Sequence, residues 1–428
     1  MDGGDLPGQK NGDLCRVHIP LHSKGIWEDV KEEKGILSHP LPRLQLQLAA
    51  IFLVAQSLHL LLRRFHLPRI VPEILAGIIM GPTFLGQIPY FTDTFFPEEG
   101  EVFIRSLSKI GFVFFMFLIG VKMDPSIVSK TGKKAWTIGV FSVVLPVLLG
   151  LGMSSVLDPM VIIYRRPALR SVIGVQTLTP FAVVACLLID LKIMNSELGR
   201  LALASALISD LLSTIVSTLL SIVRLGFAGW TSELLLKSLL FTVAFIVIIV
   251  FVMRPALLWI IRQTPEGKPV KGGYIVVIAA TVMMLAIVSD NLGLQYQLGP
   301  FILGLSVPDG PPLGSTLVER LDSLTTGLLA PLLSAQCGLK VNLWAVYDKS
   351  FMFLMWIVFI VSAVLKAIAT LIPAYLCNVP NKDAFALSVI MNAQGIVEMS
   401  SYLNNFVGQV LKKHSLCSTL QDLKCYQT

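Results

Sequence analysis

Apolar residues occur in long runs along most of the chain, and short polar segments separate the runs. A membrane-spanning helix needs about 20 mostly apolar residues to cross roughly 30 Å of hydrocarbon. The run at 294–307 is too short for a full crossing, and it is expected to be tilted or interrupted. The pattern predicts an all-α polytopic membrane protein with about twelve transmembrane segments, at 43–62, 70–88, 106–121, 135–157, 171–189, 199–223, 235–261, 273–289, 294–307, 324–339, 350–377 and 384–406.

Polar tails flank the apolar runs at both ends of the chain. Residues 1–42 lack the apolar stretch of a signal peptide, so the first run is expected to act as the targeting signal. We therefore predict a polar N-terminal tail over 1–42, a transmembrane domain over 43–406 and a short polar C-terminal tail over 407–428.

Composition narrows the class of protein. Hydrophobic residues make up 54% of the chain and charged residues only 14%, whereas soluble proteins carry about 25% charged residues. The net charge of +7 is spread over short loops and contains no Lys/Arg block typical of a nucleic-acid site. The six cysteines have no metal-ligand spacing, and no nucleotide loop or nucleophile–base pair is present. We predict no enzyme, no cofactor, no metal centre and no nucleic-acid partner.

Asp210 stands in the middle of an apolar run, 201–223. A carboxylate at the centre of a bilayer costs at least about 2.5 kcal/mol, so it should face a protein interior or a water-filled cavity. Ionisable groups at this depth mark ion or proton paths. The alternative is a structural carboxylate that is paired with a neighbouring helix or held neutral.

Two apolar runs contain polar interruptions that a continuous helix would not favour. The fifth run has Thr177, Thr179 and Pro180 near its centre. Proline removes a backbone donor and disfavours helix in the residue before it, while hydroxyls can satisfy the carbonyls left without a partner. In the twelfth run, the polar stretch with Asn392 and Gln394 interrupts the apolar pattern. We predict that both helices are broken.

The two predicted breaks lie seven segments apart, as expected for two halves related by an inverted repeat. Interrupted segments at corresponding positions of two halves are the best sequence pointer to a transporter's binding site. Glu398 follows the second break and is expected to line the cavity there. The alternative for each break alone is a proline kink or a packing glycine.

Lys366 lies in the middle of the run at 350–377, too far from either end to reach the interface comfortably. It needs a partner, and Asp210 is the predicted one. At an effective dielectric constant of 20, opposite charges about 4 Å apart attract by about 4 kcal/mol. A cation that coordinates the carboxylate could separate such a pair. The alternative is a purely structural salt bridge between two helices.

Five stretches of the chain carry a resemblance to a known family. The chain resembles the plant cation/proton exchangers, a branch of the monovalent cation:proton antiporter superfamily that is related to bacterial sodium/proton antiporters. The matching stretches span most of residues 40–405, and they are PRIVPEILAGIIMGPTFLG (68–86), GFVFFMFLIGVKMDPS (111–126), TPFAVVACLLIDLKIMNSELGRLALASALISD (179–210), GLLAPLLSAQCGLKVN (327–342) and MNAQGIVE (391–398).

The resemblance implies a sodium/proton antiporter-like inverted repeat with crossed broken helices. In that family the breaks flank an Asn-Asp or Asp-Asp pair that binds the proton or cation, and here the pair reads Ser209-Asp210. The family's buried lysine falls on Lys366. Two residues depart from the family pattern: Lys122 stands where a glutamate is common, and Gln394 stands where a lysine is common.

The function implied is exchange of K⁺ or Na⁺ for H⁺ by alternating access. Asp210 would be the carboxylate that proton and cation share, with oxygen ligands from Ser209 and Thr179. The resemblance also implies a homodimer in a lipid membrane, either an endomembrane or the plasma membrane.

Other functions stay open on the sequence alone. The family's last helix and its long C-terminal domain are not found after Tyr402. The main alternative is therefore a transport-incompetent truncated isoform that pairs with full-length partners. A channel or a seven-helix receptor is a remote third possibility.

Overall fold

The fold is helical throughout the part of the chain that the structure describes. A computed structural model describes residues 39–65, 70–88, 91, 95–96, 98–122, 132–161, 166–177, 181–193, 196–227, 232–264, 270–292, 294–308, 310–342, 349–395 and 398. The all-α prediction is confirmed over these residues. Seven helical stretches there are long and apolar enough to cross a membrane: Pro40–Leu62, Ile70–Gln87, Val102–Val121, Lys133–Met160, Leu240–Arg262, Gly272–Asn291 and Phe353–Leu376. The count of twelve spans stays a prediction.

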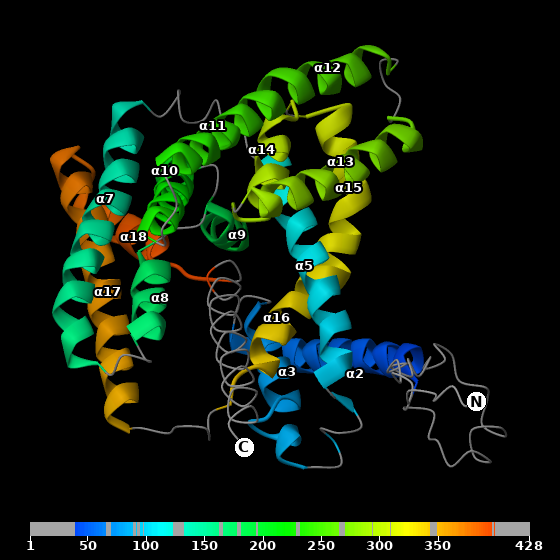
Figure 1. Cartoon of the computed structure of the whole chain (residues 1–428), viewed down its shortest axis with the longest axis horizontal. Coiled ribbons are helices and arrows are strands. Elements are labelled where there is room, and N and C mark those ends of the chain that lie inside the picture. Colours follow the sequence, from blue (N-terminus) through cyan, green and yellow to red (C-terminus); the bar gives the residue numbers. More distant parts are fainter. Residues whose placement is uncertain are drawn as a thin grey trace, which may run out of the picture.

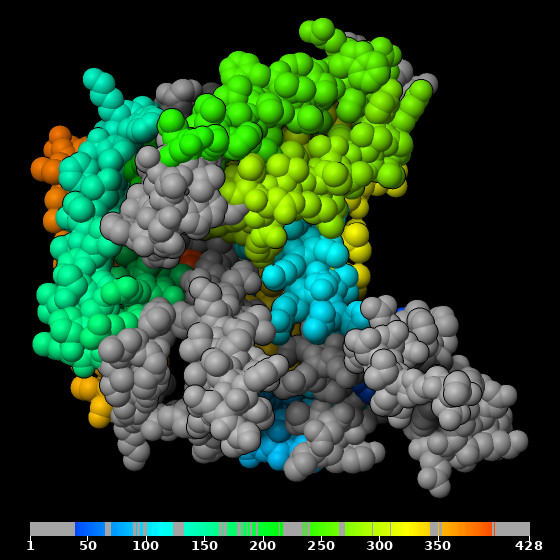
Figure 2. Space-filling model, viewed as in Figure 1, coloured from blue at the N-terminus to red at the C-terminus, as the bar shows by residue number. Residues whose placement is uncertain are grey.

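Six helices form the half of the molecule that holds the predicted site, and we call them the core group. In this group, α10 packs against α7 and α9, and α17 packs against α7, α8 and α18. Most of the group lies on the left side of Figure 1. In the space-filling view, the teal surface of α7 and α8 forms that side (Figure 2). The bounds are α7 Lys133–Leu157, α8 Arg166–Gln176, α9 Phe181–Asp190, α10 Glu197–Phe227, α17 Lys349–Leu376 and α18 Asn381–Met391.

The remaining helices form a second set, which we call the scaffold group. Its main contacts are α3 with α16, α5 with α14, and α2 with α3. The α14 helix has only nine residues, which agrees with the prediction that its apolar run is too short to cross. The bounds are α2 Pro40–Leu62, α3 Ile70–Met80, α5 Glu98–Val121, α11 Ser232–Ile248, α12 Arg254–Arg262, α13 Gly272–Asn291, α14 Leu298–Ser306, α15 Leu313–Leu324 and α16 Ala330–Leu339.

Two long helices of the scaffold group pass through a π-helical turn just before a proline. The turn Ile249–Met253 joins α11 to α12, and the turn Thr325–Leu329 joins α15 to α16. Pro255 and Pro331 are the second residues of α12 and α16. A proline inside a helix lacks the N–H that bonds four residues back, and its ring collides with that carbonyl. The wider π turn accommodates each proline without ending the helix.

Glycines allow the closest helix contacts in the scaffold group. A Cβ at Gly77 of α3 would overlap the carbonyl oxygen of Ala335 in α16. In the same way, a Cβ at Gly120 of α5 would lie 2.6 Å from the carbonyl oxygen of Phe301 in α14. Small residues let membrane helices approach closely enough for extensive van der Waals contact.

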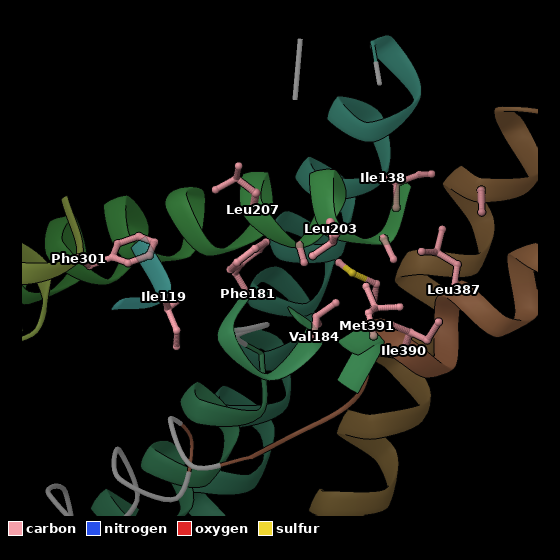
Figure 3. Packing of buried hydrophobic residues seen from close by; sticks show 14 of the residues in the cluster. Ile119, Ile138, Phe181, Val184, Leu203, Leu207, Phe301, Leu387, Ile390 and Met391 are labelled. Carbon is pink, nitrogen blue, oxygen red and sulfur yellow. The ribbon is translucent and has the colours of Figure 1, made fainter. Parts of the chain in front are cut away.

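A hydrophobic cluster joins the two groups of helices. Phe181 and Val184 of α9 lie at its centre, between Phe301 of α14 on one side and Leu387 of α18 on the other (Figure 3). Leu203 and Leu207 add the apolar face of α10. This contact places α9 and α10, which carry the predicted site, directly against the scaffold.

Candidate ion-binding site at the crossing of two broken helices

The first break lies where the proline and threonines predict it. The α8 helix ends at Gln176, and α9 begins at Phe181. The Thr177 hydroxyl donates to the Gly174 carbonyl at 2.8 Å, which satisfies one acceptor in the last turn of α8. Thr179 and Pro180 lie outside the described residues.

The second break follows α18. The α18 helix ends at Met391, and residues 393–395 have no regular structure. The Asn392 side chain donates from Nδ2 to the Ala363 carbonyl of α17 at 3.1 Å. One turn earlier, Ser388 donates to the Ala367 carbonyl at 3.0 Å. These two bonds fix the end of α18 against α17.

The two breaks touch each other. Gln394 in the second break donates a hydrogen bond to the side-chain oxygen of Gln176, at the edge of the first. Next to it, a Cβ at Gly395 would lie 2.8 Å from a methyl carbon of Val183 in α9. The prediction of crossed broken helices is thereby confirmed. Gln176 is not among the site residues predicted from the sequence, although an amide beside Thr177 in an apolar run is a signal that could have identified it.

Asp210 lies near the middle of α10, a helix of 31 residues, and its side chain is partly exposed. Ser196 caps this helix, since its Oγ accepts the Gly199 N–H at 3.0 Å. The backbone N–H of Phe181 lies close enough to the Asp210 carboxylate to interact with it electrostatically. Phe181 is the first residue of α9, so the positive end of a half-helix dipole points at the carboxylate.

Two further charged residues lie deep in the core group. Lys366 of α17 is 1% exposed and Glu398 is 3% exposed. The Gly395 N–H donates to Oε2 of Glu398 at 2.9 Å, while Oε1 accepts no hydrogen bond from the described part of the chain. Glu398 interacts electrostatically with Lys366 and also with Asp210.

The predicted pairing of Asp210 with Lys366 is not what the structure contains. None of the ion pairs between described residues joins these two side chains. Glu398 is a carboxylate that interacts electrostatically with Lys366, without an ion pair of 4.0 Å or less between described atoms. Sequence gives the depth of each charge along its own helix. It does not say which residue of another helix faces that charge.

The comparisons with known proteins agree with this geometry. Residues 48–402 match the family described as sodium/hydrogen exchanger, transmembrane. The chain belongs to this family. It is therefore an integral, multi-pass membrane protein.

Curated relatives of this chain come from Arabidopsis thaliana. It is 33% identical to Cation/H(+) antiporter 15 over 400 residues, which are 93% of this chain and 48% of the relative. It is 32% identical to Cation/H(+) antiporter 9 over 411 residues, which are 92% of this chain and 51% of the relative. The chain thus spans about half the length of the curated relatives that it matches.

A solved structure shares the fold. The sodium proton antiporter MjNhaP1 from Methanocaldococcus jannaschii superposes with a TM-score of 0.60, covering 87% of this chain and 86% of the other. The sequence identity is 16%, so the likeness speaks for the fold alone. Nothing in these comparisons favours the alternative of a transport-incompetent isoform.

Ser209, next to Asp210, is one of the residues that depart from the family pattern. Its hydroxyl is buried and makes no hydrogen bond with any described residue, and the same holds for Ser205 and Ser213. The three residues lie four apart, on one side of α10. Some other buried serines donate to a carbonyl of the preceding turn, as Ser108 and Ser334 do, whereas Ser362 of α17 also has no partner among the described residues. The α10 hydroxyls are therefore available to a ligand.

Lys122, a further departure from the family pattern, directly follows α5. Its Nζ pairs with Asp322 of α15 at 2.8 Å, and both side chains are more than a third exposed to solvent, at 39% and 35%. The lysine thus joins two scaffold helices and takes no part in the crossing of the breaks. Among the described residues, no group of three His, Cys, Asp or Glu side chains could hold a metal ion.

Proposed function

We propose that this chain exchanges a monovalent cation, K⁺ or Na⁺, for a proton by alternating access, with Asp210 as the group that both ions use. The observation that carries the proposal is the position of Asp210. A half-buried aspartate sits at mid-helix, faces the N-terminus of a half-helix and lies beside the crossing of two broken helices.

Competition for one carboxylate couples the two ions. A protonated Asp210 has no charge to attract a cation, and a bound cation disfavours protonation. Each ion therefore has to leave before the other binds, which is the condition for exchange. The buried hydroxyl of Ser209 is a further oxygen ligand, since it lacks a protein partner among the described residues. We keep Thr179 as a proposed ligand on the resemblance, and Thr177 and Pro180 as residues that form the break.

The contact between the two groups of helices supports alternating access. The side chains that meet there are apolar, with Phe112, Ile119 and Phe301 on the scaffold side and Phe181 and Leu203 on the core side. An apolar contact contains no directional bonds that must break during a displacement. The core group can therefore shift against the scaffold at low cost and open Asp210 to either side of the membrane.

The test is cation-dependent proton flux in vesicles that contain the purified chain. Adding K⁺ or Na⁺ outside should move protons, and Asp210→Asn should abolish the flux while the protein still inserts. Asp290→Asn is the matched control, because Asp290 is an exposed aspartate on α13. Undiminished flux in Asp210→Asn would remove Asp210 from the mechanism. The homodimer implied by the resemblance stays a prediction, which cross-linking in the membrane would check.

A further inference from the structure

The three charges around the crossing differ in their contact with solvent. Lys366 and Glu398 are buried, with exposed fractions of 1% and 3%. Asp210 is only partly buried. An ion that enters the site can therefore reach Asp210, whereas the lysine and the glutamate are sealed inside the core group.

Three hydrogen bonds position Glu398 relative to Lys366. Ser388 and Asn392 donate to the carbonyls of Ala367 and Ala363, so they dock the end of α18 on the turn of α17 that carries Lys366. The Gly395 N–H then holds the Glu398 carboxylate at 2.9 Å. Both charges thus sit on elements that are fixed to each other.

The charges of the site add up to one negative unit. When all three groups are ionised, Lys366 contributes one positive charge, and Glu398 and Asp210 contribute one negative charge each. One monovalent cation or one proton at Asp210 makes the total zero. Since a net charge in a low-dielectric interior is costly, the site is best moved when it is neutral.

We propose that Glu398 is the fixed counter-ion of Lys366, and that it keeps the ammonium from neutralising Asp210. This inference rests on the proposed function of Asp210, and it makes Glu398 a positioning residue. Without the Glu398 charge, Asp210 would be the one carboxylate left among these three residues, and Lys366 would pair with it. The site would then be neutral before any ion arrived, and the cation would have to displace the lysine.

The proposal predicts that one mutation rescues another. Glu398→Gln should lose most of the cation-dependent proton flux, because Lys366 then occupies Asp210. Adding Lys366→Gln removes the competing ammonium and restores a site with one negative charge. The double variant should therefore recover flux by about tenfold or more over Glu398→Gln, as expected for strongly coupled residues. It should also need less cation for half-maximal flux than Glu398→Gln does.

A matched control comes from a surface pair of the same residue types. Glu233 and Lys237 form an exposed ion pair at 2.6 Å on α11. Glu233→Gln, alone or combined with Lys237→Gln, should leave the flux unchanged. If the removal of any Lys–Glu pair lowered the flux, the flux would also fall in these control variants.

A second readout does not depend on transport. In detergent, Lys366→Gln leaves the buried Glu398 carboxylate without the nearby ammonium, and Glu398→Gln forces Lys366 to exchange one carboxylate for another. Each single variant should therefore lower the thermal midpoint. The thermal midpoint of the double variant should then be higher than the sum of the two single losses predicts. Strictly additive losses, or a double variant no more active than a folded Glu398→Gln, would overturn the proposal. If the unmodified chain shows no flux with any cation, the proposed function fails, and the stability cycle still decides whether Glu398 and Lys366 are paired.

Discussion

Gln394, in the second helix break, donates a hydrogen bond to the side-chain oxygen of Gln176, the last residue of the helix before the first break. Residues 218 positions apart in the chain thus join the two interrupted helices at their crossing. Because the bond links two side chains in the interior, the crossing depends on a glutamine at each of the two positions. This dependence can be measured.

Replacing Gln394 by Leu should destabilise the protein, since it leaves the buried Gln176 amide without its partner. Leaving a buried polar group unsatisfied costs about 1–3 kcal/mol. The double variant Gln176→Leu with Gln394→Leu should be more stable than the sum of the two losses predicts. Thermal unfolding of the unmodified chain, the two single variants and the double variant in detergent measures this double-mutant cycle. The control is the surface bond of Gln297 to Gln295, whose loss should change little.

Ser209→Ala should affect transport more than stability. The Ser209 hydroxyl is buried without a hydrogen bond among the described residues, so its removal should change the free energy of unfolding by less than about 1 kcal/mol. If the hydroxyl binds the cation, the concentration for half-maximal flux should rise. Ser142→Ala is the control, because the Ser142 hydroxyl already donates to the Gly139 carbonyl at 2.8 Å. An unchanged half-maximal concentration for Ser209→Ala would exclude Ser209 as a ligand.

Gly395→Ala should disturb the crossing sterically. The added Cβ would lie 2.8 Å from a methyl carbon of Val183. Valine is branched at Cβ and cannot turn away easily, so overpacking should cost about 1–3 kcal/mol. Combining Gly395→Ala with Val183→Ala should recover part of the loss. Gly174→Ala in α8 serves as the control, since a Cβ there meets open space. Equal melting temperatures for the unmodified chain and Gly395→Ala would contradict the close contact.

Lys122→Glu should lower the stability of the protein slightly, and a second substitution should restore it. The Lys122–Asp322 pair is well exposed, and exposed pairs contribute about 0–1 kcal/mol. Two acidic residues at this distance should weaken the contact of α5 with α15. Lys122→Glu together with Asp322→Lys should restore it. A large loss of flux without loss of stability would instead assign Lys122 a direct part in transport.

The sequence predicted the breaks well because their causes are local. Pro180, the threonines beside it, and Asn392 with Gly395 after Met391 disfavour a continuous helix whatever surrounds them. The partner of Lys366 was not predictable in this way, since it depends on how α18 docks on α17. The apolar pattern also missed the first part of a long helix. Residues before 324 carry Glu319 and Asp322, yet they form α15, which continues through the π turn into α16.

The docking of α18 on α17 has a consequence for how substitutions are tolerated. Ser388 and Asn392 donate to main-chain carbonyls at positions 367 and 363. A carbonyl is present whatever side chain stands there, so small residues at 363 and 367 can interchange without breaking either bond. The donors have no such freedom, because only certain side chains can replace Ser388 or Asn392. Variation among natural or designed variants should therefore be uneven across this contact, wide on the α17 side and narrow on the α18 side.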